Sequence, residues 1–556
     1  MQQLQPLDYG IFLIYFLIVA GYGYWIYQKK KSKTATASTD FFLAEGSLTW
    51  WAIGASLIAS NISAEQFIGM SGDGFAMGLA ISTYEWMAAA TLLIVAIFFM
   101  PIYLKNHIFT MPQFLTKRYN GTVAMIMAVF WLMLYVVVNL TSILFLGALA
   151  VSNISGLDFT LCMTGLAIFA IFITLGGMKV IGYTDVIQVF FLVLGGLATT
   201  YLALSLVSER LGLDGALAGL GALMKHSPDH FHMIFQPNDP HYPSLPGLTV
   251  LIGGMWIVNL NYWGCNQYIT QRALGADLPT ARNGILFAAF LKLLMPVIVT
   301  LPGIAAYVLW KEGLFQQEML DAGGEVSKDK AYPVLLNLLP TGLKGLSFAA
   351  LTAAIVASLA GKANSISTIF TLDIYKNYIN PTASEKRLVG TGRVVVVVAM
   401  IIAIFISPYL GIDKKGGFQY IQEYTGFVSP GVFAVFLLGF FWKRANSTGA
   451  LLSIVGGFLL SLLFKFMPDW GVDFSWLAPR FAVPNAQGVY EIPFLDRMGF
   501  VFLFCVALML ITGLAGERDN PKGLDVDPAM FRTNRTFTIG ALIIVAALTF
   551  LYTYFY

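Results

Sequence analysis

Five ionisable side chains lie within stretches that are apolar enough to cross a membrane. They are Glu65, Glu85, Asp185, Lys292 and Lys362. A charged group at membrane depth costs at least about 2.5–3.5 kcal/mol on insertion scales, so each one needs a partner, a wet cavity or a function. Glu85 and Lys292 carry opposite charges and would together leave an empty binding site neutral. Glu65 could instead face a water-filled vestibule, and Asp185 could cap a helix end or pair with Lys179.

Two polar interruptions break these apolar segments. Residues 57–69 interrupt the segment 49–75, and residues 258–264 interrupt the segment 248–267. Hydrocarbon offers the backbone no hydrogen-bond partner, so such a break is tolerated only where protein covers it or where it lines a cavity. Carbonyls freed at a break can coordinate a hard cation, helped by hydroxyls from a facing helix. The candidate ion ligands are the carbonyls of Ala59 and Ile62 and the hydroxyls of Ser358, Ser365, Ser367 and Thr368.

The polar side chains near the two breaks suit a neutral polyol. Each sugar hydroxyl can donate one hydrogen bond and accept two, so its site needs acceptors and donors together. This mixture is supplied by Gln66, Glu85, Asn259, Lys292 and Gln422. The apolar face of a sugar ring favours an aromatic platform, and Tyr262 and Trp263 lie beside the second break. Ordinary helix packing is the alternative role for this aromatic pair.

Composition predicts an all-α polytopic membrane protein. Of the 556 residues, 57% are hydrophobic and 11% are charged, and the mean hydropathy is +0.73, whereas soluble proteins carry roughly 25% charged residues. Stretches of about 20 apolar residues predict fourteen transmembrane helices, near 9–27, 49–75, 78–103, 123–151, 157–175, 183–207, 248–267, 283–310, 343–372, 393–410, 420–441, 448–467, 497–515 and 537–555. We therefore expect membrane lipid to surround most of the chain.

The distribution of basic residues predicts the orientation of the chain. Lysine and arginine collect in alternate loops, including the loop that carries Arg272, and basic loops stay cytoplasmic. Both termini are therefore predicted to lie outside the inner (plasma) membrane. Four of the five histidines fall in the outer segment 208–247, where we expect solvated surface rather than a zinc site.

The sequence argues against enzymatic and nucleic-acid functions. No nucleophile–base pair, phosphate-binding glycine loop or metal-ligand cluster is evident, so we expect neither an enzyme nor an organic cofactor. The net charge of +3 is spread over the loops and does not indicate nucleic acid. We expect no obligatory protein partner.

The two breaks fall in the second and the seventh predicted helix. This spacing is typical of a transporter built from inverted five-helix repeats, with its site at the bilayer midplane. The expected division is 1–47, an extra helix and a basic cytoplasmic loop; 48–207, the first repeat; 208–247, an extracellular loop; 248–442, the second repeat; and 443–556, three accessory helices.

Six stretches of the chain resemble the sodium:solute symporter family, and within it the sodium/glucose cotransporter branch with its bacterial sodium/galactose symporters. They are ASNISAEQFIGMSG at 59–72, YEW at 84–86, YTDVIQ at 183–188, NYWGCNQYITQR at 261–272, FQYIQEYTG at 418–426 and FLLGFFWKR at 436–444. The resemblance runs over essentially the whole chain. It implies a LeuT-type inverted five-helix repeat with one helix before it and three after it. It also implies sodium-coupled uptake of galactose or glucose by alternating access.

The resemblance also implies roles for individual residues. The implied sugar contacts are Gln66, Glu85, Asn259, Lys292 and Gln422, with Asn61 bridging the sugar site and the ion site. Tyr262 would stack on the sugar as an inner gate, with Trp263 beside it. The implied outer gate consists of Met70, Tyr84 and Phe418.

One departure from the family concerns the sodium site. The resemblance implies ligands at the carbonyls of Ala59, Ile62 and Ala354 and at two adjacent serines, with Asp185 near a second sodium position. The serine pair is Ala357-Ser358 here, and Lys362 stands one helical turn beyond Ser358, where the family has an uncharged residue.

Two hypotheses follow from Lys362. An ammonium about 4 Å from a bound ion would repel it by about 4 kcal/mol at an effective dielectric constant of about 20, so Lys362 could replace sodium in a proton-coupled or uncoupled sugar carrier. Alternatively, Lys362 points into a wet pathway or pairs with Asp185, and sodium remains the driving ion.

Overall fold

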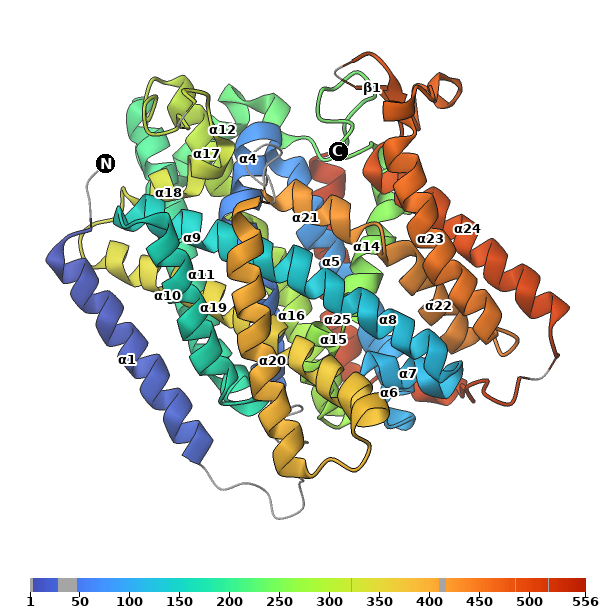
Figure 1. The fold of residues 1–556 in the computed structure, drawn as a ribbon. Coiled ribbons are helices and arrows are strands. Elements are labelled where there is room, and N and C mark those ends of the chain that lie inside the picture. The colour runs from blue at the N-terminus through green and yellow to red at the C-terminus, as the bar shows by residue number, and fades with distance from the viewer. Residues whose placement is uncertain (1–3, 29–47, 322, 410–416, 486, 519) are drawn as a thin grey trace.

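The computed structural model describes residues 4–28, 48–321, 323–409, 417–485, 487–518 and 520–556. These residues are almost entirely helical, and the helices pack side by side in one bundle (Figure 1). The basic loop predicted at 29–47 and the pair Lys414-Lys415 lie outside the described residues.

The first half of the chain contributes sixteen helical elements among the described residues. They are α1 (Pro6–Gln28), α3 (Trp50–Asn61), η2 (Glu65–Met70), α4 (Ser71–Met77), η3 (Gly78–Ser82), α5 (Thr83–Ile94), η4 (Val95–Phe99), α6 (Met100–Lys105), α7 (Met111–Arg118), α8 (Gly121–Met133), η5 (Leu134–Leu140), α9 (Thr141–Ser155), α10 (Phe159–Thr174), α11 (Met178–Arg210), α12 (Ala216–His226) and η6 (Pro228–Phe231).

The second half continues with helices and one short hairpin. The helices are α13 (Leu248–Ile252), α14 (Gly254–Gly264), α15 (Gln267–Leu274), α16 (Leu278–Ile298), α17 (Thr300–Lys311), η7 (Lys328–Lys330), α18 (Ala331–Leu336), α19 (Leu343–Thr368), η8 (Ile369–Ile379), α20 (Glu385–Ile406), α21 (Gly417–Thr425), α22 (Ser429–Phe441), α23 (Ser447–Phe466), α24 (Phe494–Ala515) and α25 (Arg535–Tyr554). Strand β1 (Val483–Pro484) pairs antiparallel with β2 (Tyr490–Glu491).

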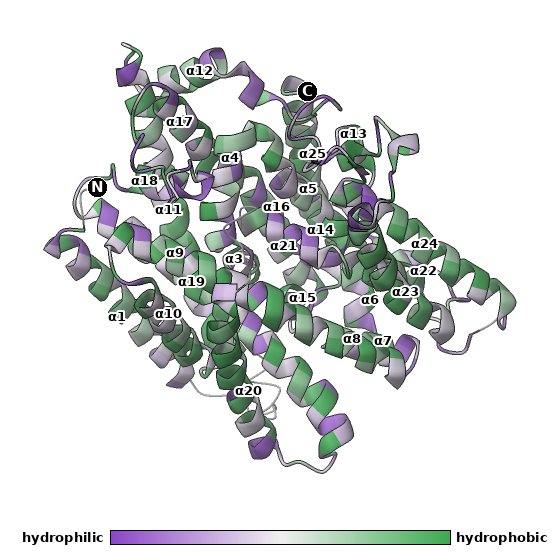
Figure 2. Ribbon diagram, turned by 45° about the horizontal axis from the view of Figure 1, so that its top comes forward, coloured by the Kyte–Doolittle hydropathy of each residue, from purple (hydrophilic) through white to green (hydrophobic). Residues whose placement is uncertain are grey.

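The chain is a polytopic helical membrane protein. Within the described residues, ten helices or helical runs are long and apolar enough to cross a membrane, and the pair Phe418–Thr425 and Ser429–Phe441, bent by 52°, makes up to eleven. Hydrophobic residues follow the long outer helices such as α20 and α24, and hydrophilic residues gather in the connecting segments (Figure 2). Helix α19 is buried along its length, whereas α1, α24 and α25 expose large apolar side chains, as expected for helices that face lipid.

The first predicted break is confirmed. Helix α3 ends at Asn61, and Ile62 is extended, with φ −78° and ψ 116°. The chain becomes helical again in η2 and α4 and then turns at Gly78, whose φ is 74°. A Cβ at Gly78 would lie 2.3 Å from the carbonyl oxygen of His230, so only glycine fits this close approach. His230 itself is buried and stacks on Tyr307 at 4.0 Å, which contradicts the expectation of solvated surface for this histidine.

The second predicted break is wrong in position. Residues 258–264 are helical within α14, and the helix is interrupted instead at Gly253 and at Cys265–Asn266. The two asparagines of this stretch find partners without unwinding the helix. Asn259 Nδ2 donates to the carbonyl of Met255 one turn earlier, at 3.1 Å, and Asn261 Nδ2 donates to Ser429 Oγ at 3.0 Å. Polarity alone therefore located the right helix but not the residues at which it breaks.

The interrupted helices meet at the centre of the bundle. Helix α3 packs against α11, α16 and α19, α14 packs against α5, and α21 packs against η2. Helix α1 lies at one flank of the bundle, and α23 and α24 lie at the opposite flank (Figure 1). Helix α1 begins and α25 ends at the same end of the molecule, the upper end in Figure 1, where α12 and β1 also lie.

Candidate functional site

The structure brings together three polar side chains at the first break. Lys292 of α16 forms an ion pair with Glu85 of α5 and donates a hydrogen bond to Asn61 Oδ1 at the end of α3. Glu85 and Lys292 are 2% and 1% exposed, so the pair lies in the protein interior and not against lipid. Each charge is neutralised by the other, so neither is left buried without a counter-charge, which would be strongly destabilising.

Two aromatic side chains border this cluster. Asn61 Nδ2 donates to the hydroxyl of Tyr262 at 3.0 Å, and the Lys292 ammonium lies 5.2 Å from the centroid of the Trp263 ring. The Tyr262 and Trp263 rings contact each other edge to face at 5.1 Å. Asn61 therefore contacts both Lys292 and Tyr262, and the aromatic pair lies directly beside the Glu85–Lys292 pair. The Tyr268 hydroxyl donates to the Tyr262 hydroxyl.

The remaining predicted sugar contacts lie on the surrounding elements. Gln66 is buried, and its Oε1 accepts a hydrogen bond from the amide of Ser63 at 3.0 Å within the break. Asn259 is buried on α14, and Gln422 is partly buried on α21. Among the described contacts, neither of these two reaches the Glu85–Lys292 pair.

The side chains predicted to form an outer gate are packed together. The rings of Tyr84 and Phe418 meet edge to face at 4.9 Å, and Met70 is fully buried. The backbone of Phe418 lies so close to η2 that a Cβ at Gly69 would be 2.9 Å from the Phe418 nitrogen. Helix α21 therefore lies directly on η2.

A second contact holds α21 in place, and sequence reasoning missed it. Buried Asp73 of α4 pairs with Lys328 Nζ at 2.5 Å and accepts a hydrogen bond from Gln419 Nε2 at 3.2 Å. The available signal was a carboxylate inside the predicted span 49–75, which is costly to bury without a partner.

The candidate ion site retains part of its predicted ligand set. The amide of Ser63 donates to Gln66 Oε1, so the Ala59 carbonyl lacks the partner that a continuous helix would give it. Ser358 Oγ donates to the carbonyl of Ser60 at 3.2 Å, which places α19 directly against the end of α3. Ile62, just beyond the end of α3, and Ala354 and Ala357 of α19 are also buried.

The other three candidate hydroxyls point elsewhere. Ser365 Oγ donates to Gln271 Oε1 at 3.0 Å, Ser367 Oγ to the carbonyl of Gly392 at 2.8 Å, and Thr368 Oγ1 to the carbonyl of Asn364 at 2.8 Å. Each of these hydroxyls donates its hydrogen to a protein acceptor, and the structure gives none of them a contact with the end of α3; their role as ion ligands stays a prediction.

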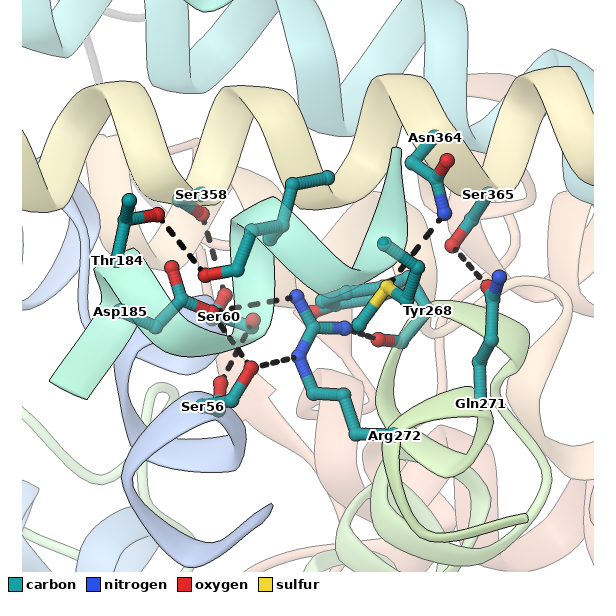
Figure 3. A network of polar contacts seen from close by, with 12 residues as sticks. Ser56, Ser60, Thr184, Asp185, Tyr268, Gln271, Arg272, Ser358, Asn364 and Ser365 are labelled. Atoms are coloured by element: carbon teal, nitrogen blue, oxygen red, sulfur yellow. Dashed lines mark hydrogen bonds and ion pairs between the residues drawn. The ribbon is translucent and has the colours of Figure 1, made fainter. Parts of the chain in front are cut away.

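Asp185 lies within α11 and does not cap a helix end (Figure 3). Its Oδ2 accepts a hydrogen bond from Ser56 Oγ at 2.6 Å and lies 4.0 Å from Arg272 Nη2. Arg272 Nε donates to Ser56 Oγ at 2.9 Å, and Arg272 is 2% exposed. Arg272 is therefore not one of the loop cations among which the sequence placed it. The side chain of Lys179, an alternative partner for Asp185, lies outside the described residues.

Lys362 pairs with Glu65 and not with Asp185. Its Nζ lies 3.4 Å from Glu65 Oε1 and 5.0 Å from the centroid of the Tyr268 ring. Lys362 is 3% exposed and Glu65 is 7% exposed. The expectation that Glu65 faces water is therefore wrong, because η2 turns this carboxylate toward α19.

Comparisons with known proteins find similar sequences over most of the chain. The profile of the sodium:solute symporter family matches residues 41–457. A sodium/glucose cotransporter of Vibrio parahaemolyticus is 48% identical over 559 residues, covering 99% of this chain and 98% of the relative. The human sodium/myo-inositol cotransporter 2 is 36% identical over 509 residues, covering 87% of this chain and 73% of the relative.

Solved structures show the same fold. A sodium-coupled sialic acid symporter, solved in a substrate-bound outward-open state, superposes with a TM-score of 0.76 at 20% identity, covering 93% of this chain and 99% of that one. A nucleobase-cation-symport-1 family transporter in a closed conformation superposes with a TM-score of 0.51 at 12% identity, covering 87% and 96%. At these sequence identities the superpositions establish the fold and nothing about the substrate.

Proposed function

Because the chain belongs to the sodium:solute symporter family, we propose that it carries a hexose, glucose or galactose, across the cell membrane together with sodium by alternating access. It is a transporter and not an enzyme. The observation that carries the proposal is the buried Glu85–Lys292–Asn61 cluster at a helix break, bordered by Tyr262 and Trp263. The 48% identity to a sodium/glucose cotransporter supports both the sugar and the ion.

In the proposed sugar site, hydroxyl groups replace some of the contacts that the cluster now makes with itself. Glu85 accepts hydrogen bonds and Lys292 donates them, so the pair can bind a sugar hydroxyl either as a donor or as an acceptor. The proposed contacts are Gln66, Glu85, Asn259, Lys292 and Gln422, with Asn61 joining the sugar site to the ion site and Tyr262 and Trp263 under the ring. The proposed gates are Tyr262 on the inner side and Met70, Tyr84 and Phe418 on the outer side.

Sodium is the second proposed substrate. Hard oxygen donors suit this ion, and the proposed ligands are the carbonyls of Ala59, Ile62 and Ala354 with the Ser358 hydroxyl and Asp185. The pairing of Lys362 with Glu65 supports sodium, because the ammonium charge is compensated by a carboxylate 3.4 Å away. Ala357 stands where the resemblance implies a second serine ligand, so the proposed sodium site lacks one hydroxyl. The alternative is a sodium-independent carrier in which Lys362 replaces the ion.

The proposed architecture is the LeuT-type inverted repeat, with the five-helix repeats at 48–207 and 248–442, one helix before them and three after, and fourteen spans in all. Both termini are proposed to lie outside the inner membrane, which agrees with their position at one end of the molecule. No protein partner is needed in this scheme.

The test is uptake of labelled galactose and glucose into proteoliposomes. An inward sodium gradient should drive accumulation in the wild type and not in Glu85→Gln, while Glu209→Gln, which changes an exposed carboxylate at the end of α11, should behave as the wild type. Equal uptake with and without the sodium gradient would refute sodium coupling and support the Lys362 carrier. Uptake of neither sugar would refute sugar transport.

A further inference from the structure

A polar cavity lies beyond the contact between Tyr84 and Phe418. Its volume is about 290 Å³, and it lies beyond the end of α4, between η7, α21, α23, β2 and the start of α24. This is the end of the molecule that the basic residues predict to face outward. The side chains that matter for the argument are Lys328, Gln419, Glu423, Glu491, Phe494 and Arg497.

The charges around this cavity balance. Glu423 pairs with Lys465 at 2.5 Å and with Arg497 at 2.9 Å, and Lys328 pairs with Asp73. The cavity is lined by three cations, Lys328, Lys465 and Arg497, and by two carboxylates, Glu423 and Glu491; buried Asp73, which does not line the cavity but pairs with Lys328, supplies the third negative charge. Burial lowers the pKa of His241, which also lines the cavity, so its ring adds no charge at neutral pH. A neutral cavity rich in donors and acceptors favours an uncharged polar ligand, since an anion would lose its hydration without a net positive partner.

The cavity shares two side chains with the contact that holds α21 against α4. Lys328 and Gln419 line the cavity, and both bind the buried carboxylate of Asp73. Gln419 follows Phe418, which packs on Tyr84 and η2. A ligand that binds Lys328 and Gln419 must therefore compete with Asp73 for them. The hydrogen bond between Gln419 and Asp73 joins α21 to α4, so this competition would weaken the contact between the two helices.

We propose that this cavity is an outer docking site for a neutral polyol, in which the hexose binds Lys328, Gln419 and Glu491 before it enters the central site. Each hydroxyl both donates and accepts, so the sugar can satisfy Lys328 and Gln419 and leave the Asp73 carboxylate exposed to water. Docking thereby loosens the contact between α21 and α4 and lets the outer gate open. The inference rests on the proposed function, since the docked sugar is the transported one.

The first test separates the two sites by binding. Purified full-length protein in lipid nanodiscs is titrated with galactose and observed by saturation-transfer NMR. Lys292→Met removes the central ion pair, and we expect it to retain a weak galactose signal. We expect Lys292→Met/Glu491→Gln to lose that signal, and gluconate, an anion of similar size, not to displace galactose. Absence of binding to Lys292→Met, alongside binding to the wild type, would overturn the docking site and leave the proposed function intact. Absence of binding to the wild type would overturn both.

The second test is kinetic. We expect Glu491→Gln to raise the KM for galactose uptake by about tenfold, equivalent to about 1.4 kcal/mol, with kcat within a factor of two, because the substitution weakens entry without touching the central site. The matched control is Asp469→Asn, an exposed carboxylate of the preceding connection that does not line the cavity. An unchanged KM in Glu491→Gln, or an equal rise in the control, would overturn the proposal.

Discussion

The Glu65–Lys362 pair allows a quantitative test of how this chain tolerates a lysine beside a sodium site. Glu65→Gln removes the carboxylate that lies 3.4 Å from the ammonium and leaves that charge uncompensated. Lys362 is four residues beyond Ser358 on α19, which at 1.5 Å per residue separates the two by about 6 Å along the helix. Two unit charges about 6 Å apart repel by about 2.8 kcal/mol at an effective dielectric constant of about 20. Sodium affinity should therefore fall by about 100-fold.

The assay is the sodium dependence of galactose uptake into proteoliposomes. Glu65→Gln should raise the half-saturating sodium concentration, whereas Lys362→Met leaves an uncompensated carboxylate and should lower it. The double variant Glu65→Gln/Lys362→Met carries neither charge and should return to the wild-type value, because the two effects share one interaction. The double variant is also a control for loss of stability. Removing only one partner of a buried ion pair can cost about 3–5 kcal/mol, whereas the double variant leaves no unpaired charge.

Two results would refute this reasoning. A wild-type sodium dependence in Glu65→Gln would mean that the Lys362 charge does not act at the ion site. Sodium-independent uptake by the wild type, together with sodium dependence in Lys362→Met, would mean that the ammonium replaces the ion.

Three further outcomes are expected. Lys292→Met should lower the melting temperature and abolish sugar uptake, because it leaves the buried Glu85 carboxylate without a counter-charge. The double variant Lys292→Met/Glu85→Gln should regain the wild-type melting temperature but not uptake. Restored uptake in the double variant would contradict the proposed sugar site. Gly361→Ala places a Cβ 2.6 Å from Arg272 Nη2 and should cost about 1–3 kcal/mol of stability by displacing the guanidinium, a loss that thermal melting would reveal. Burial lowers the pKa of His230, so its stabilising effect is complete above pH 6.5 and is lost as the pH falls through the folded-state pKa; melting between pH 7 and pH 5 should therefore decline less in His230→Gln than in the wild type.

The fold could be read from the sequence where polarity and hydropathy act locally. Helices overlap the predicted apolar stretches, but the described residues hold ten or eleven candidate spans and the predicted count of fourteen is not confirmed. The first break falls at Ile62 within the predicted stretch 57–69. The second break was misplaced because hydropathy cannot distinguish an asparagine that unwinds a helix from one that bonds back to it. Asn259 does the latter, with the carbonyl of Met255.

The ion pairs show where sequence reasoning stops. The pairing of Glu85 with Lys292 followed from two isolated charges of opposite sign. Asp185 was the one acidic partner considered for Lys362, whereas the structure pairs Lys362 with Glu65. The pairing depends on how η2 and α11 are rotated about their axes, which no spacing along the chain specifies. Arg272 was misassigned for a related reason. The sequence pattern places it among the basic loop residues that set the orientation of the chain, and only the packing shows that its side chain is buried.

The two central ion pairs are not independent of each other. Lys292 bonds to Asn61, Asn61 bonds to Tyr262, and the Tyr262 hydroxyl meets that of Tyr268, whose ring lies 5.0 Å from the Lys362 ammonium. If the sugar takes Asn61 away from Lys292, as the proposed site requires, we expect it also to alter the hydrogen bond between Asn61 and Tyr262. Since Tyr268 lies between that hydrogen bond and Lys362, sugar binding and the charge balance beside the ion site are physically connected through three side chains. We expect the binding of sugar and the binding of sodium to be coupled if the contacts among Asn61, Tyr262 and Tyr268 can adopt two alternative arrangements. Such coupling does not require α19 to move as a whole.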